Sequence, residues 1–197
     1  MEQLSFRGNV LSSDMELVRS VVQSAGYFSP EEIDIAVELV QERLRIGAKS
    51  GYEFLFARQG EDVVGYCCFG PIPCTQSSYD IYWIAVRDSF RNKGIGKAIL
   101  KRVEEVIAEL GGTRMYVETS SRPQYLSTRS FYKCCGYEQA ASFEDFYAPG
   151  DGKIIFQKLV APNHTSSTAE AYTIEKPWST GKVVAESGLV MANNAAG

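Results

Sequence analysis

The segment from Tyr79 to Gly112 constrains the fold of this chain more than any other part of its sequence. It begins with a run rich in β-branched and aromatic residues, Tyr79 to Val86, which predicts a strand. After a polar turn, apolar residues recur at helical spacing from Ile95 to Leu110 and end at Gly111-Gly112, which predicts a helix. Backbone N–H groups and the helix dipole converge where such a helix begins. The sequence Arg91-Asn92-Lys93-Gly94-Ile95-Gly96-Lys97 at this point therefore predicts an anion site, with phosphate as the natural guest.

The flanking patterns predict one α/β domain of the α+β type, with helices against a mixed, mainly antiparallel sheet of about seven strands and about four helices. We expect this domain to span residues 1–160. From residue 161 to residue 197 the composition shifts to small and polar residues, so we interpret this tail as an irregular or docked extension. Its weak strand candidates are residues 171–174 and 188–192. Further strands are expected at residues 4–7, 52–58, 63–69, 114–119, 137–147 and 153–159. Further helices are expected at residues 15–22 and 126–135. A third helix is expected to begin with a capping box at Ser29 and to end near Gly47.

Two common phosphate-binding loops do not fit this sequence. The Walker pattern requires glycine where Arg91 stands and Ser or Thr where Ala98 stands. The dinucleotide fingerprint requires a small residue where Ile99 stands. Both patterns fail, and a nucleotide hydrolase is excluded on the same residues.

The pattern that remains, Arg91-x-x-Gly94-x-Gly96 after a strand, resembles the signature of the GNAT superfamily of N-acetyltransferases. A second mark of that family is an aromatic-Tyr pair, three residues, then Gly and an aromatic. It is matched by Phe131-Tyr132-Lys133-Cys134-Cys135-Gly136-Tyr137. The likeness covers roughly Leu4 to Leu159 and leaves the tail outside. It implies the GNAT fold and a reaction in which acetyl-CoA, as cosubstrate, is attacked directly by an amine in a ternary complex, without a metal.

The resemblance implies which residues bind acetyl-CoA. The backbone N–H groups of Asn92, Lys93, Gly94, Ile95, Gly96 and Lys97 would bind the diphosphate, with positive charge from Arg91 and Lys93. The backbone of Ile84, Ala85 and Val86 would pair with the pantetheine arm. Two structural alternatives stay open. Arg91 and Lys93 could be solvated loop charges, and the side chains of residues 84–86 could be ordinary core residues.

The resemblance also implies catalytic roles for three side chains. Tyr132 would be the general acid that protonates or hydrogen-bonds the leaving thiolate. Asp80 would be the base for the amine, directly or through a water, with Glu118 in reserve, and strand alternation is expected to put Asp80 on the face of Tyr82 and Ile84. Structural roles, a gap-filling tyrosine and a loop-ending aspartate, remain alternatives. The sequence departs from the family pattern at Tyr125, where family members often have an asparagine whose side chain could hydrogen-bond pantetheine.

The amino-acid composition excludes several classes of partner and of catalytic site. The net charge is −4 and the basic residues are scattered, which disfavours a nucleic-acid partner. The five cysteines form no Cys-x-x-Cys, and His164 is the only histidine, so neither a disulfide framework, a metal site nor a nucleophilic triad is expected. The start of the chain lacks the layout of a signal peptide and no apolar run could span a bilayer, so we expect a cytoplasmic protein without a membrane partner.

The acceptor is not specified by the sequence. A small amine and a basic peptide fit equally, a homodimer is left open, and a non-catalytic acyl-CoA-binding sensor or scaffold of the same fold is the alternative function. Aromatic residues expected near the acceptor wall, although each could be core, are Tyr27, Phe28, Tyr52, Tyr79, Phe143, Phe146 and Tyr147.

Overall fold

The computed structural model describes residues 3–160, and within them the chain forms seven strands and four α-helices. The strands are β1 (Leu4–Arg7), β2 (Glu53–Gln59), β3 (Asp62–Pro71), β4 (Ser78–Val86), β5 (Arg114–Ser120), β6 (Glu138–Ala148) and β7 (Asp151–Leu159). The helices are α1 (Asp14–Ser24), α2 (Pro30–Ile46), α3 (Ile95–Glu109) and α4 (Leu126–Cys134), with three short 3-10 turns. The predicted element types are confirmed; the two strand candidates of the tail lie outside the described residues.

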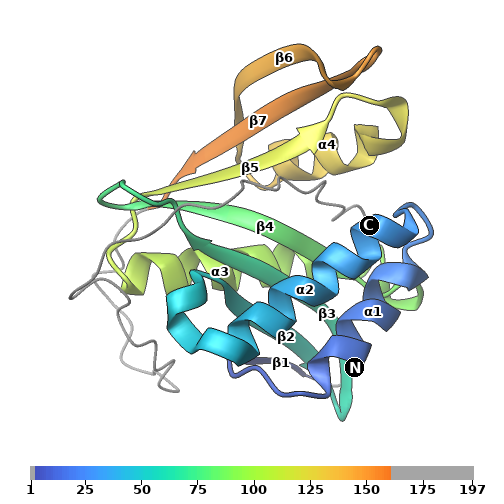
Figure 1. Ribbon diagram of the computed structural model, residues 1–197, viewed down its shortest axis with the longest axis vertical. Helices are drawn as coiled ribbons and strands as arrows, with labels where there is room; N and C mark the ends of the chain where they lie inside the picture. Colours follow the sequence, from blue (N-terminus) through green and yellow to red (C-terminus); the bar gives the residue numbers. More distant parts are fainter. Residues whose placement is uncertain (1–2, 161–197) are drawn as a thin grey trace.

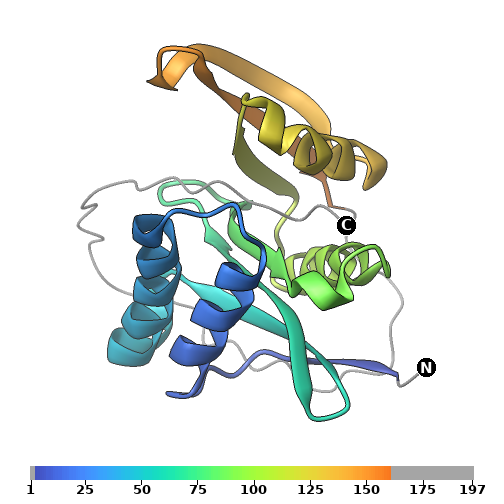
Figure 2. The ribbon, with the colours of Figure 1, turned by 90° about the vertical axis from the view of Figure 1, so that its right-hand side faces the viewer.

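All seven strands form one sheet in the order β1-β2-β3-β4-β5-β7-β6 (Figure 1). The pairing of β4 with β5 is parallel and every other pairing is antiparallel. The prediction of a mixed, mainly antiparallel sheet is confirmed. Helices α1 and α2 cover one face of the sheet, and α3 covers the other (Figure 2). Two hydrophobic clusters, one on each face, result from this arrangement.

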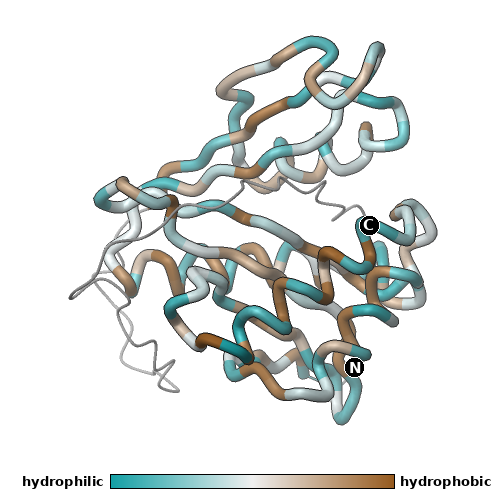
Figure 3. The backbone as a smooth tube through the Cα atoms, in the orientation of Figure 1, coloured by the Kyte–Doolittle hydropathy of each residue, from teal (hydrophilic) through white to brown (hydrophobic). Residues whose placement is uncertain are grey.

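Apolar residues spaced for one helix face hold the layers together. Hydrophobic residues recur along the helices that pack on the sheet (Figure 3). In α1, Val18, Val21 and Val22 are fully buried, and α3 buries its stripe from Ile95 to Ile107 in the same way. The predicted capping box of α2 is present: Ser29 Oγ accepts from Glu32 N, and the Glu32 carboxylate accepts from Ser29 N.

Strands β4 and β5 pair only at their beginnings. The pairing runs from Ser78↔Arg114 to Ile81↔Val117 and stops there, although β4 continues to Val86 and β5 to Ser120. Beyond this point β5 stays with β7 and β4 stays with β3, so the sheet divides (Figure 1). We call the opening between Tyr82–Val86 of β4 and Glu118–Ser120 of β5 the splay.

A β-bulge lies at the point where the splay begins. Cys68 pairs with Trp83 and Phe69 pairs with Ile81, so Tyr82 is an extra residue in β4. The bulge changes which face the following side chains occupy. Tyr82 and Trp83 both belong to the face under α1 and α2, whereas Ile81 and Ile84 both belong to the α3 face.

Candidate active site

The start of α3 is built as an anion site. Gly94 is its N-cap, with φ +77°, and Asn92 also has positive φ, at +59°. The first backbone bond of the helix runs from Ala98 N to Gly94 O at 3.0 Å. The preceding N–H groups, including those of Gly96 and Lys97, are therefore without an intrahelical acceptor. These N–H groups point out of the start of the helix, where the helix dipole is positive, and both features favour binding of a phosphate.

The two basic side chains of this loop are both held by neighbours. The Arg91 guanidinium donates to Tyr27 Oη at 2.7 Å, lies over the Tyr27 ring and approaches Asp88 at 3.5 Å. The Lys93 ammonium donates to Ser89 O at 2.9 Å and lies over the Phe90 ring. The loop is positively charged, and Arg91 connects it to the turn between α1 and α2.

The backbone of Ile84, Ala85 and Val86 borders the splay. These residues pair with β3 on one side, and β5 has already diverged on the other. Successive residues of a strand direct their N–H and C=O groups to opposite edges, so part of this backbone is directed toward the splay. Their side chains are buried, which also fulfils the expectation of core packing.

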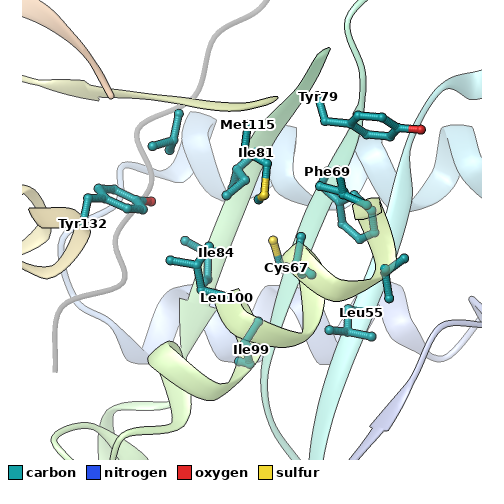
Figure 4. Close-up of a cluster of buried hydrophobic side chains, with 14 of the residues drawn as sticks. Leu55, Cys67, Phe69, Tyr79, Ile81, Ile84, Ile99, Leu100, Met115 and Tyr132 are labelled. Carbon is teal, nitrogen blue, oxygen red and sulfur yellow. The ribbon is translucent and has the colours of Figure 1, made fainter. Parts of the chain in front are cut away.

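Tyr132 presents a buried hydroxyl on the α3 face of the sheet. The side chain is fully buried, and Tyr132 Oη has no hydrogen-bond partner among residues 3–160. Its ring packs against Phe131, Tyr137 and Phe156 with centroids 5.4–5.8 Å apart. Figure 4 shows the hydroxyl pointing toward β4, near Ile84. Burial, with the thiols of Cys67 and Cys135 nearby, holds its pKa well above the ordinary tyrosine value, so it is a protonated donor with no acceptor in the described part of the chain.

Asp80 lies on the opposite face, at the mouth of the splay. It pairs in register with Tyr116, and its neighbours Tyr79 and Ile81 belong to the α3-face cluster, so its side chain is directed to the α1–α2 face. Burial, and to a smaller extent the nearby Glu118 carboxylate, raise the pKa of Asp80 to about 6, while the Lys153 ammonium opposes both effects. A carboxylate with this pKa is ionised at neutral pH and still a competent proton acceptor.

Glu118 is occupied by an ion pair. Its Oε2 lies 2.5 Å from Lys153 Nζ, and the Lys153 ammonium also lies over the Phe146 ring at 4.5 Å. Asp80, Glu118 and Lys153 form what we call the charged cluster, one residue from each of β4, β5 and β7. Sequence reasoning missed Lys153 because its contact with Glu118 depends on the register of β5 with β7. A lysine within an apolar strand run was the only signal.

The expected side-chain alternation along β4 is wrong at one position. Asp80 and Tyr82 do share a face, but Ile84 lies on the α3 face. The bulge at Tyr82 inserts one residue between them and reverses the alternation. Asp80 therefore meets the splay from the α1–α2 face, and Ile84 meets it from the other.

The aromatic residues expected at the acceptor wall separate into groups. Tyr79 is core: it is buried in the α3-face cluster, and a Cβ on Gly112 would lie 2.8 Å from its ring. Tyr52 packs edge-on against Tyr82 beside Asp80, and Phe28 packs against Trp83. Tyr27 contacts Arg91. Tyr125 is fully buried in the turn before α4. The exposed hairpin residues are Phe143, Phe146 and Tyr147.

The cysteines are free thiols, as the sequence indicates. Burial raises the pKa of Cys67, Cys68 and Cys135 above the ordinary thiol value, which disfavours a nucleophilic thiolate. No cluster of His, Cys, Asp and Glu suited to a metal ion occurs within residues 3–160, and His164 lies outside them. None of the helices in this part of the chain is long and apolar enough to cross a membrane.

Comparison with known proteins agrees with this geometry. Residues 22–137 match the Acetyltransferase (GNAT) family. A structure from Desulfovibrio desulfuricans assigned to the GNAT family is 45% identical, covers 81% of this chain and 100% of its own, and has a TM-score of 0.79. No curated protein matches the chain.

More distant structures share the fold. The ribosomal-protein-S18-alanine N-acetyltransferase from Escherichia coli is 13% identical, covers 87% of this chain and 100% of its own, and has a TM-score of 0.65. An aminoglycoside 6'-N-acetyltransferase complexed with coenzyme A is 18% identical, covers 82% and 98%, and has a TM-score of 0.65. The fold and its family assign this protein to the acyltransferases. The chain belongs to the GNAT acetyltransferase family.

Proposed function

We propose that this protein is an N-acetyltransferase that transfers the acetyl group of acetyl-CoA to an amine by direct attack in a ternary complex. The observation that carries this proposal is the placement of two proton-transfer groups on opposite faces of one opening. Asp80 meets the splay from the α1–α2 face, and Tyr132 directs its hydroxyl toward β4 from the α3 face. An amine could enter on one face while the thiolate leaves toward the other.

The cosubstrate is proposed to lie on the α3 face. The N–H groups of residues 92–97 would bind its diphosphate, with Arg91 and Lys93 adding charge, and the backbone of residues 84–86 would pair with its pantetheine arm. Two observations support the fit. The N–H groups that precede the first backbone bond of α3 have no intrahelical acceptor, and Tyr132 Oη has no hydrogen-bond partner within residues 3–160. The aminoglycoside acetyltransferase of the same fold was solved with coenzyme A.

The proposed reaction removes two protons from the acceptor ammonium. The ionised Asp80 takes the first, directly or through a water, and the amine nitrogen attacks the thioester carbonyl carbon. A backbone N–H of Ile84, Ala85 or Val86 would stabilise the oxyanion. The nitrogen of the tetrahedral intermediate then gives its second proton to water. As the carbon–sulfur bond breaks, Tyr132 donates its proton to the sulfur and regains one from water, or it holds the thiolate by a hydrogen bond.

Asp80 is favoured over Glu118 as the base. The Glu118 carboxylate is held in an ion pair with the Lys153 ammonium, with 2.5 Å between Oε2 and Nζ. Burial, and next the Glu118 carboxylate, raise the pKa of Asp80 to about 6, which suits a proton acceptor at neutral pH. Glu118 then acts on the reaction through its effect on Asp80.

The acceptor is proposed to be a small amine or the amine of a peptide. The solved relatives include one named for alanine of ribosomal protein S18 and one named for aminoglycosides, so the fold serves both kinds. We further propose that residues 1–160 are the catalytic domain and that residues 161–197 are an extension of it.

The decisive experiment measures release of free CoA thiol by the full chain with acetyl-CoA and a panel of amines and peptides. We expect thiol release that depends on the acceptor and is strongly reduced in Tyr132→Phe. If acetyl-CoA binds in calorimetry but no acceptor releases thiol above background, the acyl-CoA sensor replaces the enzyme.

A further inference from the structure

Lys153 is an unusual residue to find at the splay because its charge is buried. The residue is only 8% exposed, and its ammonium is bound by Glu118 and covered by the Phe146 ring. Burying an ammonium is costly unless the charge is paired. The ion pair with Glu118 offsets that cost, so the pair is a stable part of the site.

The three charges of the cluster lie on one face and act on each other. Met115 and Val117 belong to the α3-face cluster, so Glu118 is directed to the α1–α2 face together with Asp80. Lys153 pairs in register with Ser120, two residues along β5 from Glu118, which places it diagonally opposite that carboxylate. Asp80 pairs in register with Tyr116, two residues along β5 from Glu118, so the two carboxylates are diagonal neighbours on this face.

The charge balance of the cluster fits one cation. With Asp80 ionised, two carboxylates and one ammonium leave one net negative charge. One acceptor ammonium beside Asp80 neutralises it. A second ammonium on the same acceptor, directed past Asp80 toward β5 and β7, would meet Lys153 in place of a free carboxylate. Like charges a few ångströms apart in a partly buried site repel strongly.

We propose that Lys153 is a specificity-determining residue that restricts the acceptor to amines with a single ammonium at the site and disfavours diamines and polyamines. The inference rests on the proposed acetyl transfer to an amine at this splay. It adds a selection rule: the carboxylate that could bind a second cation is already occupied by the protein's own lysine.

The test compares two matched pairs of acceptors, pentylamine with cadaverine and benzylamine with para-xylylenediamine. Within each pair the apolar part is the same and the second amino group is the difference. The measured quantity is the ratio of kcat/KM for the diamine to that for the monoamine, from CoA thiol release by the full chain. Lys153→Met should raise this ratio about tenfold or more by leaving Glu118 free, and Lys153→Arg should leave it near the wild-type value.

Two controls isolate the charge. Lys101→Met removes a lysine from the exposed side of α3, and we expect the wild-type ratio. Combining Glu118→Gln with Lys153→Met removes both members of the ion pair and restores the original net charge, so the ratio should return toward wild type. A ratio within twofold of wild type in folded Lys153→Met would overturn the inference.

The wild-type protein also tests the inference without any variant. A wild-type ratio above two, beyond the statistical advantage of two equivalent amines, would overturn it even if Lys153→Met does not fold. No turnover of all four amines by the wild-type chain would also overturn it. In that case thiol release with the wider panel decides separately whether the acetyl transfer itself stands.

Discussion

A Cβ added to Gly96 would lie 3.4 Å from the ring of Phe131, the residue directly before Tyr132. The start of α3 therefore packs against the helix that carries the proposed general acid. Both parts of the GNAT signature, separate in the sequence, meet at this contact. A change in the proposed diphosphate loop can thus affect the position of Tyr132, so acetyl-CoA binding and turnover have to be measured separately.

The first prediction concerns the loop. Gly96→Glu should abolish acetyl-CoA binding, because its Cβ would lie against Phe131 and Val86, and the longer charged side chain could fit there only by displacing the start of α3. Gly94→Glu should do the same by adding charge at the helix start. Isothermal calorimetry measures both. Lys101→Glu, on the exposed side of the same helix, is the control and should bind normally; equal binding by all three variants removes the loop from the site.

The second prediction concerns Tyr132. Tyr132→Phe should lower kcat by ~100-fold to ~10,000-fold while acetyl-CoA affinity is nearly unchanged, because only the proton donor is lost. The midpoint of thermal unfolding should stay the same or rise, since a buried hydroxyl without a partner among the described residues is removed.

The matched control for Tyr132 is Tyr137→Phe. Tyr137 is equally buried, its ring packs on Tyr132, and its hydroxyl donates to Met115 Sδ at 3.6 Å. We expect it to keep most of the turnover. Full activity of Tyr132→Phe would assign the leaving-group proton to water.

The third prediction concerns pH. Because the pKa of Asp80 is about 6, the base is ionised above that pH and protonated below it. With saturating acetyl-CoA, the transfer rate should fall about tenfold per pH unit below that value. Asp80→Asn should remove or displace this acidic limb. An unchanged limb in Asp80→Asn would mean that bulk water deprotonates the amine.

Substitutions at the two charged neighbours of Asp80 should shift the acidic limb of the pH profile in opposite directions. Glu118→Gln removes a charge that raises the pKa of Asp80, so the limb should persist and shift to lower pH. Lys153→Met removes a charge that lowers it, so the limb should shift to higher pH. Identical shifts in the two variants would show that Asp80 is not the titrating group.

The fourth prediction concerns stability. Asp14 is 1% exposed and accepts from both terminal nitrogens of Arg7 and from Leu11 N. Asp14→Ala should cost about 3–5 kcal/mol, since it leaves a partly buried guanidinium without its carboxylate. Asp34→Ala, which breaks an exposed pair with Arg19, should cost less than about 1 kcal/mol. Urea denaturation compares them; similar losses would contradict the role of burial.

The sequence by itself determined the elements and the class of protein. Short sequence patterns predicted each helix and strand. The capping box at Ser29, the apolar stripe after Ile95 and the glycines at the start of that helix each involve only a few neighbouring residues. The family signatures are also local, so the fold class and the loop could be predicted. Asp80 and Glu118 could be proposed as candidate bases because the sequence places them in two predicted strands.

Only the tertiary structure decided which charged neighbours those acids have. The register of β5 with β7 joins Lys153 to Glu118, and no local pattern sets the register of strands far apart in sequence. The bulge at Tyr82 reverses the alternation of β4 and separates Asp80 from Ile84. Bulges and registers depend on pairing with other strands, so the ion pair that occupies Glu118 and the separation of Asp80 from Ile84 arise only when the sheet forms.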